Sequence, residues 1–349
     1  MESESPIPCG PFDLLEPVGQ GGMGEVWRAV HAETGLPAAV KVLRRLAEAS
    51  AGELRQFRRE VQAHAKLRHP RIVRIYEYGE IGEAGERASG GDLVAGSPYF
   101  AMEFAPCGTL AERGVGDWPT LRDFLVQVLD ALAFSHSREV VHRDLKPENV
   151  LVFESEDAAA GVDYKLADFG IARAIDDHRI RGTTEFFHPS GGTPLYMAPE
   201  QFRGQWRRFG PWTDLYQLGA IAFELASGRP PYTGEKFVEI ARGHMMEPLP
   251  RLEPRFPVPE RFEAWVRGLL EKHPADRLRY AGDAIWTLDR FVGDGDEPAV
   301  EGEEREALEG GETQRRSSDQ ITETLVLTMP RWDGGGGDDT GVDTYGETL

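Results

Sequence analysis

Apolar and polar residues alternate along the first third of the chain in the way that is typical of half-buried β-strands. Strands are predicted over residues 13–19, 25–31 and 36–43, with a glycine-rich turn between the first two; the second alternates, and the third is apolar and rich in residues that favour strands. Two more strands are predicted over residues 72–78 and 99–104. We therefore expect the first part of the chain to be rich in β-structure.

Helical spacing of apolar residues dominates the rest of the chain. One early helix is predicted over residues 47–68, because this stretch has no Pro and His69-Pro70 follows it. Residues 79–97 are rich in Gly, Glu and Ala and are expected to form a mobile loop. Further helices are predicted over residues 120–138, 213–227, 236–246, 259–272 and 282–292. A small β-rich part is thus followed by a larger helical part.

Composition excludes several classes of protein. The 349 residues carry a formal net charge of −20, which argues against general binding to nucleic acids or anionic membranes. No run approaches ~18 uncharged apolar residues, so no membrane span is expected, and the acidic first residues do not resemble a secretory signal. The two cysteines, Cys9 and Cys107, exclude a disulfide scaffold and a thiolate zinc site, so we expect a cytoplasmic protein.

The last residues of the chain differ from the rest. Residues 293–349 hold 16 Asp and Glu against 4 Arg, a net charge of −12, and they are rich in Gly and Thr. Such a composition is typical of a disordered tail. Ser317, Ser318 and the Thr-rich apolar run over residues 321–330 leave two interpretations open. The tail is either an autophosphorylated segment for a phospho-binding partner or a solvated extension.

Three features in the first 60 residues point to phosphate binding. A glycine-rich turn over residues 18–24 lies between two strands, and its backbone amides can approach a phosphate without obstruction by Cβ atoms. Lys41 follows on an apolar strand, where a lysine is costly to bury unless it is paired. Glu60, on the predicted helix, could hold that lysine. Alone, the glycine-rich turn is equally compatible with a hairpin that binds no ligand, and Glu60 fits a solvated helix face, the usual environment of a glutamate, better than a pair with Lys41.

Three longer motifs follow: HRDLKPENVL at residues 142–151, KLADFG at 165–170 and GTPLYMAPE at 192–200. Together they resemble the catalytic loop, the metal motif and the Ala-Pro-Glu motif of the eukaryotic-like protein kinases, in the family's order and spacing. The resemblance covers residues 12–292 and is strongest to the bacterial Ser/Thr branch. Lys146, two positions after Asp144, is typical of Ser/Thr kinases.

The resemblance implies a fold and its boundaries. The fold class is α+β, the bilobal protein-kinase fold with a small β-rich N-lobe and a larger helical C-lobe. We expect an N-terminal arm over residues 1–11, the N-lobe over 12–105 and the C-lobe over 106–292. Residues 293–349 form the acidic, disordered tail.

The resemblance also implies the chemistry, which is transfer of the γ-phosphoryl group of ATP to Ser or Thr hydroxyls of protein substrates. Asp144 is expected to accept or orient the proton of the attacking hydroxyl, and Lys146 to reach the γ-phosphate. Lys41 is expected to bind the α- and β-phosphates and to pair with Glu60. The implied ligands of Mg²⁺, with Mn²⁺ as the alternative ion, are Asp168 and Asn149, the single Asn of the chain.

The nucleotide pocket is implied by the same family. Met102 is expected at the back of the pocket, and backbone groups of Glu103 and Ala105 are expected to bind the adenine edge. Apolar side chains would enclose the ring. The implied nucleotide-binding residues are Val18, Gly19, Gln20, Gly21, Gly22, Met23, Gly24, Val26, Ala39, Lys41, Met102, Glu103, Ala105 and Leu151.

Some residues are expected to be structural. By the resemblance, His142 and Phe169 stack in a column between the lobes, and His64 is a packed, neutral histidine near it. Asp214 is expected to cap the backbone of the catalytic loop. The same resemblance pairs Arg277 with Glu200.

The activation segment, residues 168–200, holds the phosphorylation candidates. Thr183 and Thr184 are preferred, and Ser190 is the competing candidate. A phosphate there could gather Arg143 and Arg173 and order the segment. Autophosphorylation through a transient dimer is one route to this state.

Two other functions are compatible with the same fold. A pseudokinase scaffold would bind nucleotide without turnover, but the intact Lys41, Glu60, Asp144, Asn149 and Asp168 disfavour it. A small-molecule phosphotransferase would lack the protein-substrate platform that residues 192–200 resemble.

Overall fold

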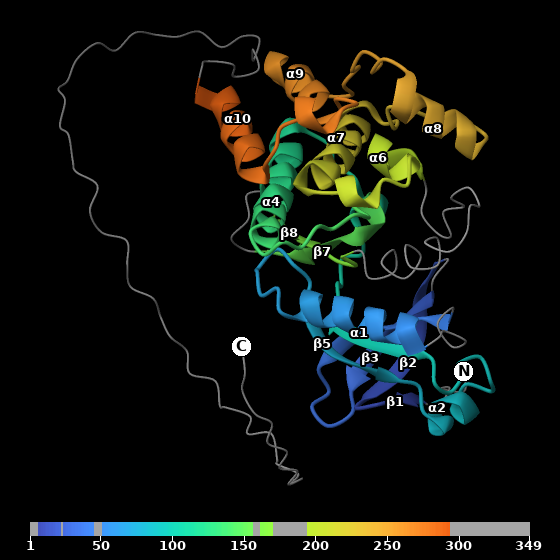
Figure 1. Cartoon of the computed structure of the whole chain (residues 1–349). Coiled ribbons are helices and arrows are strands. Elements are labelled where there is room, and N and C mark those ends of the chain that lie inside the picture. Colours follow the sequence, from blue (N-terminus) through green and yellow to red (C-terminus); the bar gives the residue numbers. More distant parts are fainter. Residues whose placement is uncertain (1–5, 22–23, 45–50, 156–160, 170–193, 294–349) are drawn as a thin grey trace, which may run out of the picture. The chain divides into compact units, whose positions relative to one another are not determined.

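The computed structural model describes residues 6–21, 24–44, 51–155, 161–169 and 194–293. The chain divides into two compact units, Met1–Val300 and Glu301–Leu349, and the second lies wholly outside the described residues. Within the first unit, a lobe built on a β-sheet precedes a helical lobe (Figure 1). This is the α+β bilobal fold that the sequence predicts. The tail predicted over residues 293–349 lies outside the described ranges except for Gly293, which is helical.

Six strands form one antiparallel sheet in the order β1-β2-β3-β4-β6-β5. Their bounds are β1 Ile7–Cys9, β2 Phe12–Gly21, β3 Gly24–His31, β4 Pro37–Val42, β5 Ile75–Glu80 and β6 Pro98–Glu103. Alternate residues of β4 serve the two faces of the sheet. Ala39 joins a cluster with Phe57 and Val61 of helix α1 (Ala51–Ala65), whereas Val40 joins a cluster with Trp27.

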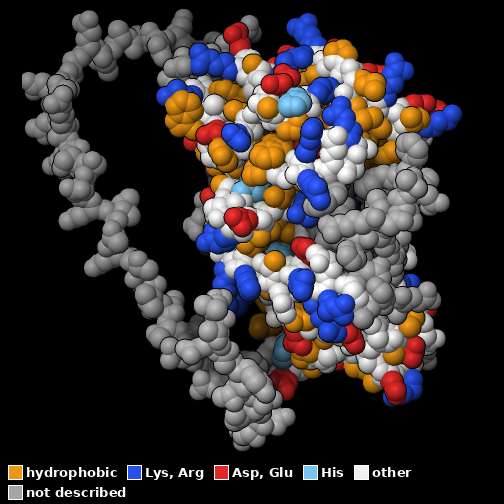
Figure 2. Space-filling view, viewed as in Figure 1, with side chains coloured by type: hydrophobic (Ala, Val, Ile, Leu, Met, Phe, Trp, Pro, Cys, Tyr) orange, Lys and Arg blue, Asp and Glu red, His pale blue; other side chains and the backbone are white. Residues whose placement is uncertain are grey.

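Helix α1, which the sequence predicts over residues 47–68, is amphipathic. Its inner face carries the buried Phe57 and Val61, while Arg55, Arg58 and Arg59 are exposed. Figure 2 shows Lys and Arg side chains over the middle of the molecule, at the level where α1 runs in Figure 1. The helix therefore contacts the sheet through one face only.

Residues 79–97 are more ordered than the sequence predicts. They include the end of β5 and helix α2 (Glu83–Ala88), and Leu93 is fully buried. Helix α2 packs against β1, where a Cβ on Gly85 would come within 2.6 Å of the carbonyl oxygen of Pro8. The predicted arm over residues 1–11 thus contributes a strand to the sheet. Three residues are too few to show a period, so the sequence could not reveal β1.

The helical lobe follows residue 105. Its α-helices are α3 Leu110–Arg113, α4 Trp118–His136, α6 Pro199–Phe202, α7 Pro211–Ser227, α8 Phe237–Met246, α9 Glu260–Leu269 and α10 Ala281–Gly293. The five longest agree with the predicted helices to within a few residues. Short 3₁₀ turns are η2 Pro147–Asn149, η3 Pro194–Tyr196, η4 Trp206–Arg208 and η5 Pro274–Asp276. One apolar core joins α4, α7, α9 and α10.

Two short strands position the catalytic loop, and the sequence did not predict them. Strands β7 (Val150–Glu154) and β8 (Val162–Leu166) form an antiparallel hairpin, with Leu151 opposite Lys165. The loop over residues 142–149 leads into β7, and Asp168 lies two residues after β8. No helix within the described ranges is both long enough and apolar enough to cross a bilayer.

Candidate active site

The glycine-rich turn is the tip of the β2–β3 hairpin. Its register pairs Gly19 with Val26 and Gly21 with Gly24, while Gly22 and Met23 lie outside the described residues. A Cβ on Gly24 would overlap the carbonyl oxygen of Val42, so this position requires glycine. The predicted nucleotide-binding residues that the structure describes on this hairpin thus lie on two paired strands.

Lys41 has a different partner from the predicted one. It lies on β4 opposite Val26, its side chain is 17% exposed, and its ammonium group forms an ion pair with the carboxylate of Asp168. Glu60 instead accepts a hydrogen bond of 2.7 Å from Gln56, one turn earlier on α1. A shielded carboxylate needs a counter-charge, and Lys41 supplies it to Asp168 rather than to Glu60. The predicted Lys41–Glu60 pair is therefore not formed in this structure.

The catalytic loop brings three predicted residues together. Asn149 is buried and donates from Nδ2 to the backbone oxygen of Asp144 at 2.7 Å and to its Oδ2 at 3.2 Å. The ammonium group of Lys146 lies 3.5 Å from the same Oδ2. A carboxylate, an amide and an ammonium group thus share one small region.

Asp214 holds the backbone of this loop, as predicted. Its carboxylate accepts hydrogen bonds of 2.7 Å from the backbone N–H groups of His142 and Arg143. Arg143 has φ = 66°, in the left-handed region that non-glycine residues rarely occupy. Burial acts to raise the pKa of Asp214, but the hydrogen bond from His136 and nearby charges lower it overall. The carboxylate is therefore ionised and can accept both bonds.

Two buried glutamines also hold the loop, and the sequence analysis did not identify them. Gln201 and Gln217 donate from Nε2 to the backbone oxygen of Arg143 at 2.8 and 3.2 Å. Gln217 also accepts from the N–H of Leu145 at 3.1 Å. A signal was present for Gln217, because it lies three residues after Asp214 and therefore on the same helix face.

Asp168 is a shielded carboxylate that pairs with Lys41. Burial acts to raise its pKa, but Lys41 and the more distant His64 and Lys146 lower it overall. Its second oxygen, Oδ1, is buried without a hydrogen-bond partner in the described part of the chain. Asp168 and Asn149 offer oxygen ligands, which a hard divalent cation prefers. No group of three or more His, Cys, Asp or Glu side chains with metal-site geometry occurs among the described residues, so phosphate oxygens would have to complete such a site.

Four of the predicted adenine-binding residues, Val26, Ala39, Met102 and Leu151, belong to one apolar cluster that spans both lobes. Ala39 pairs with Met102 across β4 and β6, and both are nearly buried. Val26 and Leu151 pack against the same cluster, which also holds Ala167. Apolar side chains are the kind of wall that a purine ring requires.

The predicted column between the lobes is present. The rings of His142 and Phe169 lie 4.6 Å apart between centroids, and the ring of His64 lies 4.8 Å from that of Phe169. Burial lowers the pKa of His64 to about 4, so the ring is neutral at pH 7. The prediction of a packed, neutral histidine is confirmed.

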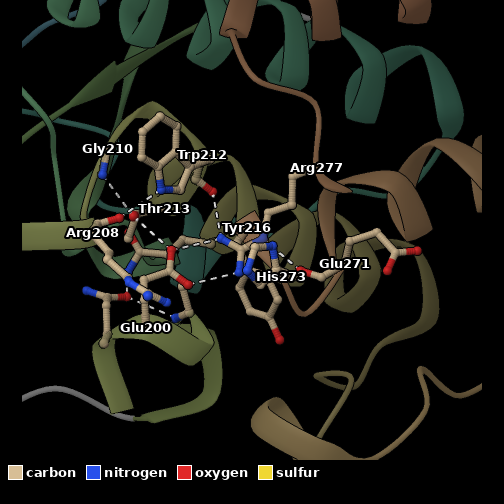
Figure 3. Close-up of polar contacts among 12 residues, drawn as sticks. Glu200, Arg208, Gly210, Trp212, Thr213, Tyr216, Glu271, His273 and Arg277 are labelled. Carbon is tan, nitrogen blue, oxygen red and sulfur yellow. Dashed lines mark hydrogen bonds and ion pairs between the residues drawn. The ribbon is translucent and has the colours of Figure 1, made fainter. Parts of the chain in front are cut away.

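Figure 3 shows the predicted pair of Glu200 and Arg277. Two parallel hydrogen bonds of 2.8 and 2.9 Å join the guanidinium group to the carboxylate, and both side chains are buried. Thr213 donates to the same carboxylate at 2.9 Å, and the guanidinium lies over the ring of Tyr216. The pair connects the Ala-Pro-Glu motif to the segment between α9 and α10 of the same lobe. The phosphorylation candidates Thr183, Thr184 and Ser190 lie outside the described residues.

Known proteins share both the sequence pattern and the fold. The family described as "Protein kinase domain" matches residues 12–282. A probable serine/threonine-protein kinase PknB of Bifidobacterium longum is 36% identical over 242 residues, 68% of this chain and 33% of that protein. Serine/threonine-protein kinase PknA of Mycobacterium tuberculosis is 33% identical over 276 residues, 78% of this chain and 59% of that protein. The chain thus spans less than two thirds of these relatives.

A comparison with a solved structure supports the fold and nothing more specific. The PknI kinase domain of Mycobacterium tuberculosis is superposable with a TM-score of 0.59 at 24% identity, covering 84% of this chain and all of that domain. The family match over residues 12–282 assigns the chain to the protein kinases. The bacterial relatives assign it to a branch of that family. The chain belongs to the eukaryotic-like protein kinase family, in its bacterial serine/threonine branch.

Proposed function

We propose that this protein is a Mg-ATP-dependent serine/threonine protein kinase. The observation that carries the proposal is the position of Lys146 beside the carboxylate of Asp144. Its ammonium group lies 3.5 Å from Asp144, and its charge also lowers the pKa of Asp168. Phosphoryl transfer depends mainly on such positioning and neutralisation of charge.

The residues of the loop have distinct roles in this proposal. Asp144 orients the Ser or Thr hydroxyl of a protein substrate and holds its proton, and Asn149 fixes the side chain of Asp144 through the 3.2 Å bond. Lys146 neutralises the negative charge of the γ-phosphate beside Asp144. When bound, Mg²⁺ would neutralise phosphate charge, and Asp168 and Asn149 are the residues that would hold it, or Mn²⁺ in its place.

Lys41 binds the α- and β-phosphates in this proposal. Its present ion pair with Asp168 leaves the lysine ready to exchange one anionic partner for another. Met102, Ala39, Val26 and Leu151 supply the apolar walls for adenine. The same enzyme autophosphorylates in its activation segment, with Thr183 or Thr184 preferred over Ser190.

The test is mass spectrometry of a mixture of Ser-, Thr- and Tyr-containing peptides after incubation with the full chain and Mg-ATP. We expect phosphate on Ser and Thr peptides and on the chain itself. Asp144→Asn should abolish both products, while Asp92→Asn, at an exposed loop carboxylate, should leave them unchanged. Nucleotide binding without any product would favour the pseudokinase, and phosphate only on added small alcohols would favour a small-molecule phosphotransferase.

A further inference from the structure

Lys165 is one of six lysines in the chain, and the proposed chemistry gives it no role. It lies on β8 opposite Leu151, three residues before Asp168. Its side chain is 17% exposed, and its ammonium group donates to Oε1 of Glu103 at 2.5 Å. The same group lies 4.3 Å from the centre of the Phe153 ring. Lys165 is thus held by specific partners on two sides.

Glu103 connects this lysine to the segment between the lobes. It is the last residue of β6 and follows Met102 at the back of the nucleotide pocket. Its backbone N–H donates to the backbone oxygen of Arg74 at 2.9 Å, and its Oε2 faces the N–H of Arg74 at 3.5 Å. The carboxylate therefore bridges the strand that leads to Asp168 and the chain that leads into β5.

A second ion pair joins the same strand to the N-lobe. Asp163 lies two residues before Lys165 and therefore on the same side of β8, whereas Tyr164 and Leu166 point into the core. Asp163 pairs with Arg71, which precedes β5. The backbone reinforces this contact, because Leu166 donates from its N–H to the oxygen of Arg71 at 2.9 Å.

We propose that the pairs Lys165–Glu103 and Asp163–Arg71 form a β8 clamp, and that Lys165 is a positioning residue. The clamp holds the register between the end of β6 and β8, the strand that leads to Asp168. Its side chains are 17–27% exposed, whereas those of the surface pair Arg229–Glu253 are 63% and 70% exposed. Partial burial reduces screening by solvent and salt, so the clamp pairs should couple more strongly than surface pairs.

Hydrogen exchange of the nucleotide-free full chain tests the clamp directly. Lys165→Met should speed exchange of the backbone N–H groups of Glu103 and Leu166, both of which are bonded to the segment 71–74. The matched control is Lys236→Met, at an exposed lysine that directly precedes α8. Lys165→Arg keeps the charge and should retain the slow exchange. If Lys165→Met and Lys236→Met exchange alike at both amides, the clamp does not exist.

A second readout concerns nucleotide, and it rests on the proposed function. We expect Lys165→Met to weaken the binding of Mg-ADP about three- to five-fold by calorimetry, and to raise KM for ATP while kcat changes little. A reversed pair, Glu103→Lys with Lys165→Glu, should recover part of the affinity. Equal affinities in wild type and Lys165→Met would overturn the positioning role. A wild-type chain that binds no nucleotide would refute the proposed function, and the exchange experiment would still decide on the clamp.

Discussion

The buried pair of Glu200 and Arg277 allows a sharp test of what holds the helical lobe together. Arg277 makes five hydrogen bonds: two to Glu200, and one each to the backbone oxygens of Trp212, Glu271 and Lys272. Arg277→Met would keep much of the side-chain volume but remove all five. It would also leave the carboxylate of Glu200, which is 1% exposed, without a cation.

The expected loss follows from that uncompensated charge. Removing one partner of a buried pair typically lowers the free energy of unfolding by about 3–5 kcal/mol, out of a total of about 5–15 kcal/mol. Glu200→Gln in the same chain removes the stranded charge but keeps an acceptor for the hydroxyl of Thr213. The double variant should therefore be more stable than Arg277→Met by about 1–2 kcal/mol.

Urea unfolding followed by tryptophan fluorescence measures these differences as shifts in the midpoint at constant slope. The matched control is Arg229→Met, which breaks the exposed pair with Glu253 and should change stability by about 0–1 kcal/mol. The reasoning fails if Arg277→Met is no less stable than this control. It also fails if adding Glu200→Gln destabilises the Arg277→Met variant further.

Three further predictions concern the site and its regulation. Asp168→Ala should lower phosphotransfer by more than about 100-fold in a radiolabel assay without unfolding the chain; turnover within a few-fold of the Asp92→Asn control would contradict its metal-binding role. The neutral His64, with its pKa lowered to about 4 by burial, stabilises the fold fully above the unfolded pKa of ~6.5 and loses this contribution as the pH falls toward 4. His64→Leu should therefore lose less stability than wild type between pH 7 and pH 5 in urea unfolding, and equal losses would argue against a depressed pKa. Thr183→Ala combined with Thr184→Ala should reduce turnover after autophosphorylation more than Ser190→Ala does; the opposite order would move the switch to Ser190.

The partners of residues within the long motifs could be predicted from the sequence, because the family fixes them. Asp214 caps the catalytic loop and Arg277 pairs with Glu200 as predicted, although each pair is separated by some 70 residues or more. The partner of Lys41 could not be predicted in the same way. It depends on where α1 rests against the sheet, and a helix can shift by a small distance without any change of sequence. The structure accordingly pairs Lys41 with Asp168 rather than with Glu60.

The other differences arise from elements that are too short to produce a periodic signal. Strand β1 has three residues and α2 has six, and the glycines around α2 suggested a loop. The information lay in the isolated apolar residues Ile81 and Leu93, which are buried among the residues that face β1. Gln201 could not be predicted for a related reason, because a single buried glutamine produces no periodic signal in the sequence.

Strand β1 has a practical consequence for anyone who shortens this protein. The family match begins at Phe12, and a chain cut there would lose the strand that pairs with β2 through Cys9 and Phe12. The backbone N–H and C=O groups along that edge of β2 would become open to pairing with another molecule. Tyr99, now 2% exposed, would also lose the neighbouring Cys9. A recombinant kinase domain defined by the family boundary should therefore aggregate more readily than one that begins at or before residue 6.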